Sequence, residues 1–239
     1  MSKEAIQSAT LLGQTEGHLV SVPGGHLLQK EVALAFTALQ RAAQKAGFEL
    51  AIASSFRSFE RQRSIWNAKA AGQRAVHDDS GCAVDMSCLS DVEKMHAILR
   101  YSALPGASRH HWGTDMDVYD ASAVAADYSV QLSLQEVAPG GVFDALHCWL
   151  DDCMKRGESF GFFRPYAIDR GGVAPERWHL SYAPTARQYS EALSPHSLKA
   201  CWDCLSQDEG LLLQASVEAE FEAIFERYIT VPDDGWAGE

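Results

Sequence analysis

The chain has 239 residues, enough for one large or two small domains, and its 46% hydrophobic and 10% aromatic content is that of an ordinary globular protein. Its formal net charge of -12 argues against a nucleic-acid-binding surface, which needs a basic patch, and against adhesion to anionic membranes. Chemistry on a small molecule or a peptide is the class of function that remains.

Targeting and cysteine signals are weak. Met1 to Gln14 is polar and mixed, without the charged segment and apolar run of a signal peptide, so a cytoplasmic location is expected. No stretch approaches the roughly 20 apolar residues that a membrane-spanning helix needs. The six cysteines lack the spacing of a disulfide framework and are expected to be reduced thiols.

The first third of the chain predicts scaffold. Residues 1–26 hold several glycines and little periodicity, and are predicted to be an N-terminal arm. From Leu27 hydrophobic residues recur at helical spacing as far as Ala46, and Gly47 follows as the residue after the C-cap. This helix is expected to be part of the core.

A strand and a second helix come next. Residues 49–54 alternate as a strand and are expected to carry Arg57 on the loop at its end. Ser58 is predicted to cap a helix over 59–70, on which Gln62 lies. Gln62 is interpreted either as a solvated helix residue or as a substrate contact.

A polar loop then precedes a third helix. The loop between Gly72 and Leu89 contains ligand-type side chains at a spacing that matches no familiar site, so loop residues are the main interpretation and a substrate-lining role the alternative: His77, Asp78, Asp79 and Asp85. Ser90 and Glu93 form a predicted capping box, and the helix that they open is expected to end before Pro105.

The richest stretch is residues 108–117, which concentrates two histidines and two carboxylates in Ser-Arg-His-His-Trp-Gly-Thr-Asp-Met-Asp. His110 and Asp117 are candidate metal ligands, and Gly113 would let the chain turn between them. His111 would point away from His110 in extended backbone, so packing is the favoured interpretation for it. The stretch 116–119 alternates as a strand.

The following region is predicted to be an insertion with a helix behind it. Residues 121–141 would form the insertion, with a hairpin over 128–134 beside the site. Asp144 opens a helical pattern that Gly157 closes. The aromatic run 160–166 fits either a pocket wall or the core.

A second ligand motif lies about sixty residues after the first. In Glu176-Arg177-Trp178-His179, a histidine stands three positions after a carboxylate, and a strand over 178–182 is predicted. Catalytic zinc takes three protein ligands and lowers the pKa of a water in its fourth position to roughly 7. His110, Asp117 and His179 could supply the three bonds, and Glu176 could take the proton from that water. Together the motifs predict a zinc hydrolase.

After Ala192 the chain is predicted to be helical around 195–205 and 211–229. Packing of these helices onto the domain is the main interpretation, and dimerisation or covering of the cleft are alternatives. The tail from Asp233 is expected to be loose. Strands interspersed with helices, without a regular βαβ repeat, indicate an α+β fold with the ligands on an antiparallel sheet.

Three motifs carry a family resemblance. The motif Ser-x-His-x-x-Gly-x-x-x-Asp at 108–117, the motif Glu-x-Trp-His at 176–179 and Ser-Ser-Phe-Arg-Ser at 54–58 with Gln62 resemble the signature of VanY/VanX-type D-Ala-D-Ala metallopeptidases. These enzymes share a zinc fold with lysostaphin-type enzymes and the hedgehog signalling domain. Two positions depart from the pattern: Asp115 replaces a small residue, and Ser55 replaces the usual glycine.

The resemblance implies a central antiparallel sheet that carries the ligands, with helices around it. A zinc peptidase domain is predicted over 27–192, and the helices over 193–239 are predicted to be a C-terminal extension that lies beyond the resemblance. It implies zinc on His110, Asp117 and His179, with Asp117 preferred to Asp115 because it holds the family's spacing. It also implies Glu176 as general base and Arg57 as oxyanion stabiliser. Gln62 and Ser108 are predicted to bind the substrate, and for Ser108 the alternative is a hydrogen bond to a nearby backbone group.

The function expected from this resemblance is that of a zinc-dependent D-alanyl-D-alanine carboxypeptidase that cleaves peptidoglycan-type peptides through Glu-assisted attack of zinc-bound water. A peptidoglycan endopeptidase and a non-catalytic zinc-stabilised binding module are the alternatives. A cell-wall substrate also makes a periplasmic or cell-wall location an alternative to the cytoplasm. The partner is expected to be a small peptide rather than nucleic acid, and the sequence does not indicate an oligomeric state.

Overall fold

A four-stranded antiparallel sheet in the order β3-β4-β6-β5 lies at the centre of the computed structural model, which describes residues 6–206 and 210–236. The expected α+β class is therefore confirmed, and the two motif-bearing strands, β4 and β6, are neighbours in the middle of the sheet. The strands are β3 (Leu50–Ser54), β4 (Asp115–Asp120), β5 (Phe162–Phe163) and β6 (His179–Tyr182).

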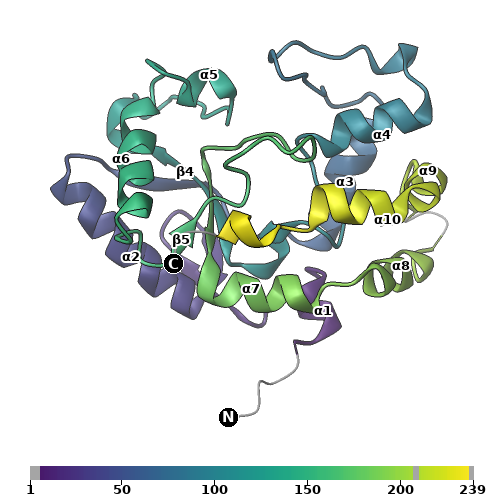
Figure 1. Cartoon of the computed structure of the whole chain (residues 1–239), viewed down its shortest axis with the longest axis horizontal. Coiled ribbons are helices and arrows are strands. Elements are labelled where there is room, and N and C mark those ends of the chain that lie inside the picture. Colours follow the sequence, from purple (N-terminus) through teal and green to yellow (C-terminus); the bar gives the residue numbers. More distant parts are fainter. Residues whose placement is uncertain (1–5, 207–209, 237–239) are drawn as a thin grey trace.

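Helices surround this sheet on both sides (Figure 1). None of them, within the described part of the chain, is long and apolar enough to cross a membrane. They are α1 (Ser8–Leu11), α2 (Lys30–Lys45), α3 (Phe59–Ala70), α4 (Asp91–Leu99), α5 (Leu134–Val137), α6 (Asp144–Lys155), α7 (Ala183–Ala192), α8 (Pro195–Asp203), α9 (Gln214–Ala219) and α10 (Phe221–Ile224), which continues into a π-helical turn over Phe225–Ile229.

The helix boundaries follow local capping chemistry. The side chain of Ser58 accepts a hydrogen bond from the backbone N–H of Arg61 at the start of α3, as predicted. Ser90 and Glu93 form the predicted capping box of α4. These two helices therefore begin where the sequence indicates.

Two hydrophobic clusters flank the sheet. One joins α2 and α6 to the strands, through residues that include Phe36, Leu39, Met116, Leu150 and Leu180. The other is larger and joins α3, α4 and α7 to the C-terminal helices, through residues that include Trp66, Ile98, Trp202, Phe221 and Ile224. The C-terminal helices thus pack onto the body of the protein, as the main interpretation of their sequence held.

The N-terminal region departs from its sequence-based interpretation. Residues 19–29, expected to be loop and the start of a helix, form a hairpin of β1 (Leu19–Val22) and β2 (His26–Gln29), so α2 begins only at Lys30. Gly24 and Gly25 both have positive φ and make its turn. The Gln29 side chain donates to the carbonyl of Trp112, which ties the hairpin to the first ligand motif.

The predicted hairpin over 128–134 is wrong. No strand is assigned there, because Leu132 has a φ of 52° and the segment folds around the buried carboxylate of Glu136. That carboxylate accepts hydrogen bonds from the hydroxyl of Tyr128 and from the backbone N–H groups of Gln131 and Ser133. An internal acceptor, rather than a partner strand, organises the insertion.

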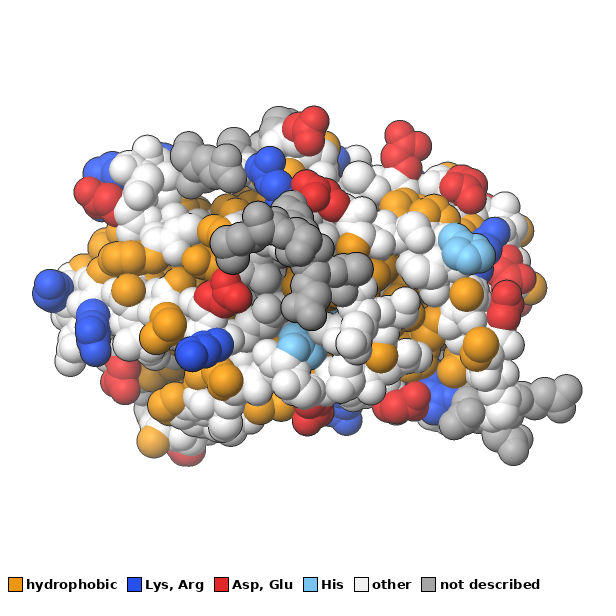
Figure 2. Space-filling view, turned by 90° about the horizontal axis from the view of Figure 1, so that it is seen from below, with side chains coloured by type: hydrophobic (Ala, Val, Ile, Leu, Met, Phe, Trp, Pro, Cys, Tyr) orange, Lys and Arg blue, Asp and Glu red, His pale blue; other side chains and the backbone are white. Residues whose placement is uncertain are grey.

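The surface carries both signs of charge. On the face shown in Figure 2, acidic and basic side chains are scattered among hydrophobic patches. The cysteines are free thiols, four of them exposed and two, Cys153 and Cys201, buried.

Candidate active site

The sheet brings the two ligand motifs together by its register. Asp117 on β4 pairs directly with His179 on β6, and directly opposed residues of antiparallel strands project to the same face. His110 lies one turn before β4, in the 3-10 helix Arg109–Trp112, and Gly113 follows with a φ of 68°. The chain therefore reverses between His110 and Asp117, and both side chains reach the same point as His179.

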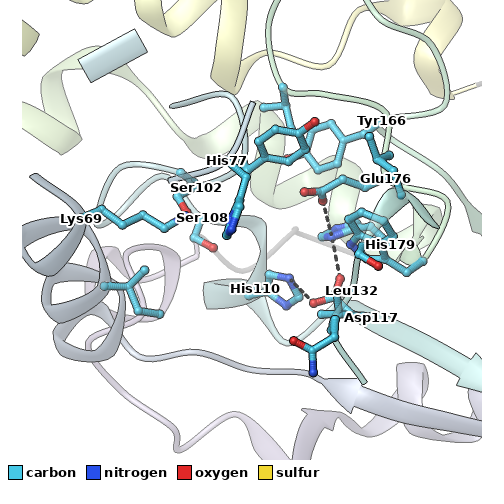
Figure 3. Close-up of a pocket in the computed structure, with 18 of the residues that line it drawn as sticks. Lys69, His77, Ser102, Ser108, His110, Asp117, Leu132, Tyr166, Glu176 and His179 are labelled. Atoms are coloured by element: carbon cyan, nitrogen blue, oxygen red, sulfur yellow. Dashed lines mark hydrogen bonds and ion pairs between the residues drawn. The ribbon is translucent and has the colours of Figure 1, made fainter. Parts of the chain in front are cut away.

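These three side chains form the one candidate metal cluster found within the described residues. One ligand atom from each of His110, Asp117 and His179 lies within 4.8 Å of the others, and all three residues are buried. The Asp117 carboxylate lies between the imidazoles, with its Oδ2 3.4 Å from Nε2 of His110 and its Oδ1 3.2 Å from Nδ1 of His179 (Figure 3).

Each histidine is oriented through its other ring nitrogen. Nδ1 of His110 lies 2.9 Å from the carbonyl oxygen of Ser55, and Nε2 of His179 lies 2.9 Å from Oδ1 of Asp115. Such contacts fix the tautomer and the ring orientation, and leave Nε2 of His110 and Nδ1 of His179 facing Asp117. Ser55, one of the two departures from the family pattern, thus contributes its backbone.

Asp115, the other departure, lies behind the cluster rather than in it. It is completely buried, and its carboxylate accepts hydrogen bonds from Nε of Arg109 at 2.8 Å and Oγ1 of Thr114 at 2.5 Å. The Arg109 guanidinium in turn donates to Ser181 at 2.6 Å and lies over the ring of Trp236, 5.3 Å from its centroid. The segment from Asp233, expected to be loose, therefore includes a packed residue.

The electrostatics of the cluster suit a cation. Oδ1 of Asp117 is buried and has no hydrogen bond of good geometry, although carboxylate oxygens strongly need one when buried. Burial lowers the pKa of His110 to about 4, so its imidazole is neutral and can offer a lone pair. Burial also acts to lower the pKa of His179, but the hydrogen bond to Asp115 and the nearby carboxylate of Asp117 outweigh it and raise that pKa to about 9. Two imidazoles that can each offer a lone pair when neutral, and a carboxylate oxygen without a hydrogen bond, make a donor set that fits zinc.

Glu176 lies beside this cluster without being part of it. Its Oε2 is 3.7 Å from Nδ1 of His179, and 14% of its side chain is exposed. Burial raises the pKa of its carboxyl to about 7; the charge of His179 opposes that rise and the charge of Asp117 adds to it. A carboxyl with a pKa near neutrality can both accept and donate a proton at neutral pH.

Arg57 reaches the same cavity from the loop after β3. Its guanidinium donates to Oε1 of Gln62 at 2.8 Å and to Oγ of Ser54 at 3.4 Å. Gln62 is fully buried, and its amide donates to the carbonyl of Ala103, so it is a structural support of Arg57 rather than a solvated helix residue. Ser108 is buried and lines the cavity.

His111 is not brought to the cluster. Its Nε2 accepts a hydrogen bond from the backbone N–H of Gly106, and its Nδ1 lies 2.5 Å from the carbonyl oxygen of Arg57. It therefore holds the loops that carry Arg57 and His110, in agreement with the packing interpretation.

A cavity of about 610 Å³ opens above the cluster. Its walls include Lys69 and Ser102, which sequence reasoning did not assign to the site. Tyr166, from the aromatic run, and the segment 131–135, from the insertion, also line it, as one interpretation of each stretch held. Lys69 lies seven residues after Gln62 on the same helix, and this spacing was the available signal. Of the loop acids and histidine considered in the sequence, His77 and Asp78 line the cavity.

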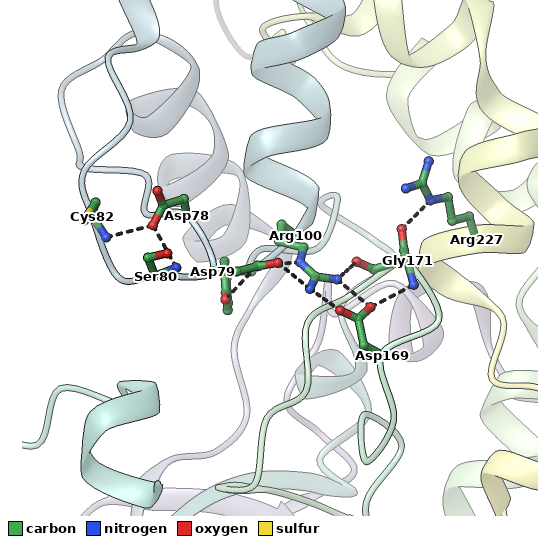
Figure 4. A network of polar contacts seen from close by, with 10 residues as sticks. Asp78, Asp79, Ser80, Cys82, Arg100, Asp169, Gly171 and Arg227 are labelled. Carbon is green, nitrogen blue, oxygen red and sulfur yellow. Dashed lines mark hydrogen bonds and ion pairs between the residues drawn. The ribbon is translucent and has the colours of Figure 1, made fainter.

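An ion-pair network holds the loop that carries these two residues (Figure 4). Arg100, at the end of α4, donates to both carboxylate oxygens of Asp79 and to both of Asp169, at distances from 2.5 to 2.9 Å. It also donates to the carbonyl of Gly172. One guanidinium therefore joins the loop after α3 to the loop before β6.

Comparison with known proteins agrees with these motifs. A family model described as "VanY: D-alanyl-D-alanine carboxypeptidase" matches residues 25–185. An uncharacterised protein of Haemophilus influenzae is 52% identical over 98 residues, which is 39% of this chain and 67% of the relative. Another from the same organism is 33% identical over 128 residues, 53% of this chain and 92% of the relative.

Among solved structures, the fold is similar to a crystal structure of a mutant of the vancomycin resistance D,D-pentapeptidase VanY, from a VanB-type resistance cassette, in complex with Zn(II). The TM-score is 0.50 at 22% sequence identity, and the match covers 75% of this chain and 88% of the other. At this identity the likeness concerns the fold.

Proposed function

The chain belongs to the VanY D-alanyl-D-alanine carboxypeptidase family, a family of peptidases, and from this membership we propose that it is a zinc-dependent carboxypeptidase that removes the terminal D-alanine from peptidoglycan-type peptides. The observation that carries the proposal is the convergence of His110, Asp117 and His179 within 4.8 Å, in a cavity that Glu176 and Arg57 also line. A structural metal site would need neither a base nor a nearby guanidinium.

His110, Asp117 and His179 would hold the metal. When bound there, zinc would lower the pKa of a coordinated water and polarise the carbonyl of the scissile amide. The crystal structure of the VanY mutant with Zn(II) supports zinc as the metal, since that protein has the same fold.

Glu176 is assigned the proton transfers. Its carboxylate accepts the proton of the attacking water as the new carbon–oxygen bond forms, and then donates that proton to the nitrogen of the leaving amine as the carbon–nitrogen bond breaks. The pKa of about 7, which burial produces, suits both directions of transfer. Its contact with His179 keeps it within reach of the water without making it a ligand.

Arg57 is assigned to the developing oxyanion. Gln62 and Ser54 hold its guanidinium from behind, so little reorganisation is needed when negative charge develops on the carbonyl oxygen. Gln62 acts through Arg57, and Ser108 is proposed to contact the peptide because its hydroxyl lines the same cavity.

The test is release of D-alanine from a peptide that ends in D-Ala-D-Ala, with zinc-loaded protein and with protein stripped by a chelator. We expect turnover with zinc, loss of turnover after stripping, and recovery when zinc is restored. Cleavage only within cross-linked peptides would favour the endopeptidase alternative. Binding of the peptide without cleavage would favour the binding module.

A further inference from the structure

The inner side of α3 forms one wall of the cavity. Gln62, Ile65 and Lys69 recur at spacings of three and four residues, so they lie on one face of the helix. Gln62 is used to support Arg57, and Ile65 supplies an apolar surface. Lys69 is the remaining polar group of this wall, and the proton transfers and oxyanion contacts proposed above leave it without a role.

Lys69 has an unusual environment for a lysine. Among the described residues its ammonium makes one hydrogen bond, 2.7 Å long, to the neutral hydroxyl of Ser102, although an ammonium has three protons to donate. Burial lowers the pKa of Lys69 to about 8; the charges of Arg74 and Arg57 lower it further, and the charge of Glu176 opposes them. A half-buried cation that has cationic neighbours and a neutral partner is a ready site for an anion.

Ser102 completes a two-donor arrangement. Its Oγ accepts the hydrogen bond from Lys69, so its own proton remains available for another acceptor. An ammonium beside a hydroxyl matches the two oxygens of one carboxylate.

The position of this pair relative to the metal cluster suggests which carboxylate it takes. In Figure 3, Lys69 extends toward Ser102 and Ser108 on one side of the cavity, and Glu176 and His179 lie on the other side. The proposed function places the scissile carbonyl at the metal cluster, and we take the residue after it to lie on the side of the cavity where Lys69 lies. The first anionic group beyond the scissile bond of a terminal residue is its α-carboxylate.

We propose that Lys69 and Ser102 bind the α-carboxylate of the leaving residue, and that this pair makes the enzyme a carboxypeptidase rather than an endopeptidase. The inference rests on the proposed function, because it takes the scissile bond to lie at the metal cluster. It adds a specificity-determining lysine to the site.

The experiment compares N-acetyl-D-Ala-D-Ala with its C-terminal amide, for wild type and for Lys69→Met, which keeps the length of the side chain. Loss of one charge-assisted hydrogen bond should lower kcat/KM on the free acid by about 10- to 100-fold, mainly through KM. The amide should be cleaved poorly by the wild type and about equally by both proteins. Lys69→Arg should restore much of the preference for the free acid.

Arg61→Met is the matched control, because it removes a positive charge from the exposed side of the same helix, eight residues earlier. It should keep the preference of the wild type. Equal preference for free acid over amide in wild type and Lys69→Met would overturn the inference while leaving the peptidase function intact.

Binding separates this inference from the proposed function. In zinc-loaded protein with the Glu176→Gln change, calorimetry should show tighter binding of the free acid than of the amide, and addition of Lys69→Met should remove the difference. This result would support the carboxylate site even if the wild type cleaved neither peptide, in which case the proposed function fails alone. Equal binding of acid and amide before Lys69 is changed would overturn the inference.

Discussion

The two ends of the cavity are built in different ways. One end, called the metal end below, holds the candidate metal cluster. There Asp117 and His179 lie on paired strands, and His110 lies on the turn that enters one of them. All three residues are buried, and each side chain has a second contact behind it, to Ser55, Asp115 or a neighbouring ligand.

The other end, called the peptide end below because the proposal places the peptide there, has a wall from one face of α3, the loop after it and the insertion 121–141. Lys69 is half-buried there, and His77 and Asp78 are exposed. Its most extensive ion-pair network, around Arg100, uses the carboxylates of Asp79 and Asp169, which are 61% and 46% exposed.

This difference separates two tasks. A metal site needs its donor atoms fixed to within a few tenths of an ångström, which paired strands and buried second contacts provide. A peptide end must admit and release a ligand. Loops that are held by exposed ion pairs can open at a low cost in free energy. Substitutions at the metal end should therefore have large effects on metal binding and chemistry, and those at the peptide end should change substrate preference and loop motion.

The largest effect is expected for His179→Ala. Removal of one of three protein ligands should lower zinc content to near background, and activity should be lost with it. Elemental analysis of purified protein, together with turnover, measures both. Full zinc content in this variant would mean that the metal lies elsewhere.

Glu176→Gln tests the same end without touching a ligand. Zinc content and folding should stay near those of the wild type, and kcat should fall by roughly 10²- to 10⁴-fold because positioned proton transfer is lost. Steady-state kinetics beside metal analysis would show it. A variant that keeps the kcat of the wild type contradicts the assigned base, and one that loses zinc makes Glu176 a ligand.

Asp115→Asn should give an intermediate effect. Without the carboxylate, His179 loses its charged partner and Arg109 loses its counter-ion, so zinc affinity should fall by about 10- to 100-fold. Chelator competition measures this affinity without any assay of activity. Asp117→Ala should lose zinc outright. If Asp115→Asn lost zinc and Asp117→Ala only bound it more weakly, Asp115 would be the ligand and Asp117 its support.

A pH profile sharpens the description of the peptide end. Because the pKa of Lys69 is about 8, its ammonium is present below that pH and is lost as pH rises through it, so kcat/KM on the free acid should decline in alkaline solution. Lys69→Arg stays charged there and should lack this decline. The ratio of the two profiles over about pH 7 to 9.5 removes titrations that both proteins share.

The ratio of the two pH profiles is needed because other titratable side chains line the same cavity. Besides the three candidate ligands, the charged or titratable side chains that line the cavity with Lys69 are Arg57, Arg74, His77, Asp78, Tyr101, Arg109, Tyr166 and Glu176. Burial raises the pKa of Tyr101 to about 12, so its phenol stays neutral over the range. Identical alkaline declines in the two proteins would assign the decline to a shared group.

Arg100→Gln should have the smallest effect on stability, below about 1 kcal/mol, because the ion pairs that it breaks are largely exposed. Hydrogen exchange over the loop that carries His77 should nevertheless become faster, since Asp79 loses both of its bonds to the guanidinium. Zinc affinity should not change. A fall in zinc affinity would show that the two ends of the cavity are coupled.

The metal end could be predicted from the sequence because its residues come in two short motifs. His110 and Asp117 are seven residues apart, and Glu176 and His179 three apart, so spacing alone relates members of each pair. The sequence alone does not show that the two motifs lie side by side; that follows from the pairing of β4 with β6. An antiparallel sheet that carries the ligands was already expected.

The peptide end could not be predicted in the same way. Lys69 looks like a surface lysine until the segment at Ser102 is known to lie against α3. The alternation in 128–134 favoured a hairpin, but the carboxylate of Glu136 supplies the acceptors that a partner strand would have supplied. The hairpin at 19–29 had a signal in Gly24 and Gly25. Its two strands have only four residues each, which is too short for a clear alternating pattern.

The pairing of Asp117 with His179 also has a topological consequence. The two residues are 62 positions apart in the chain, so an ion bound to both would act as a reversible cross-link that closes a long loop. A covalent link across such a loop lowers the entropy of the unfolded chain by an amount worth about 4 kcal/mol. Metal supply would then govern how long the folded enzyme survives, as well as whether it is active.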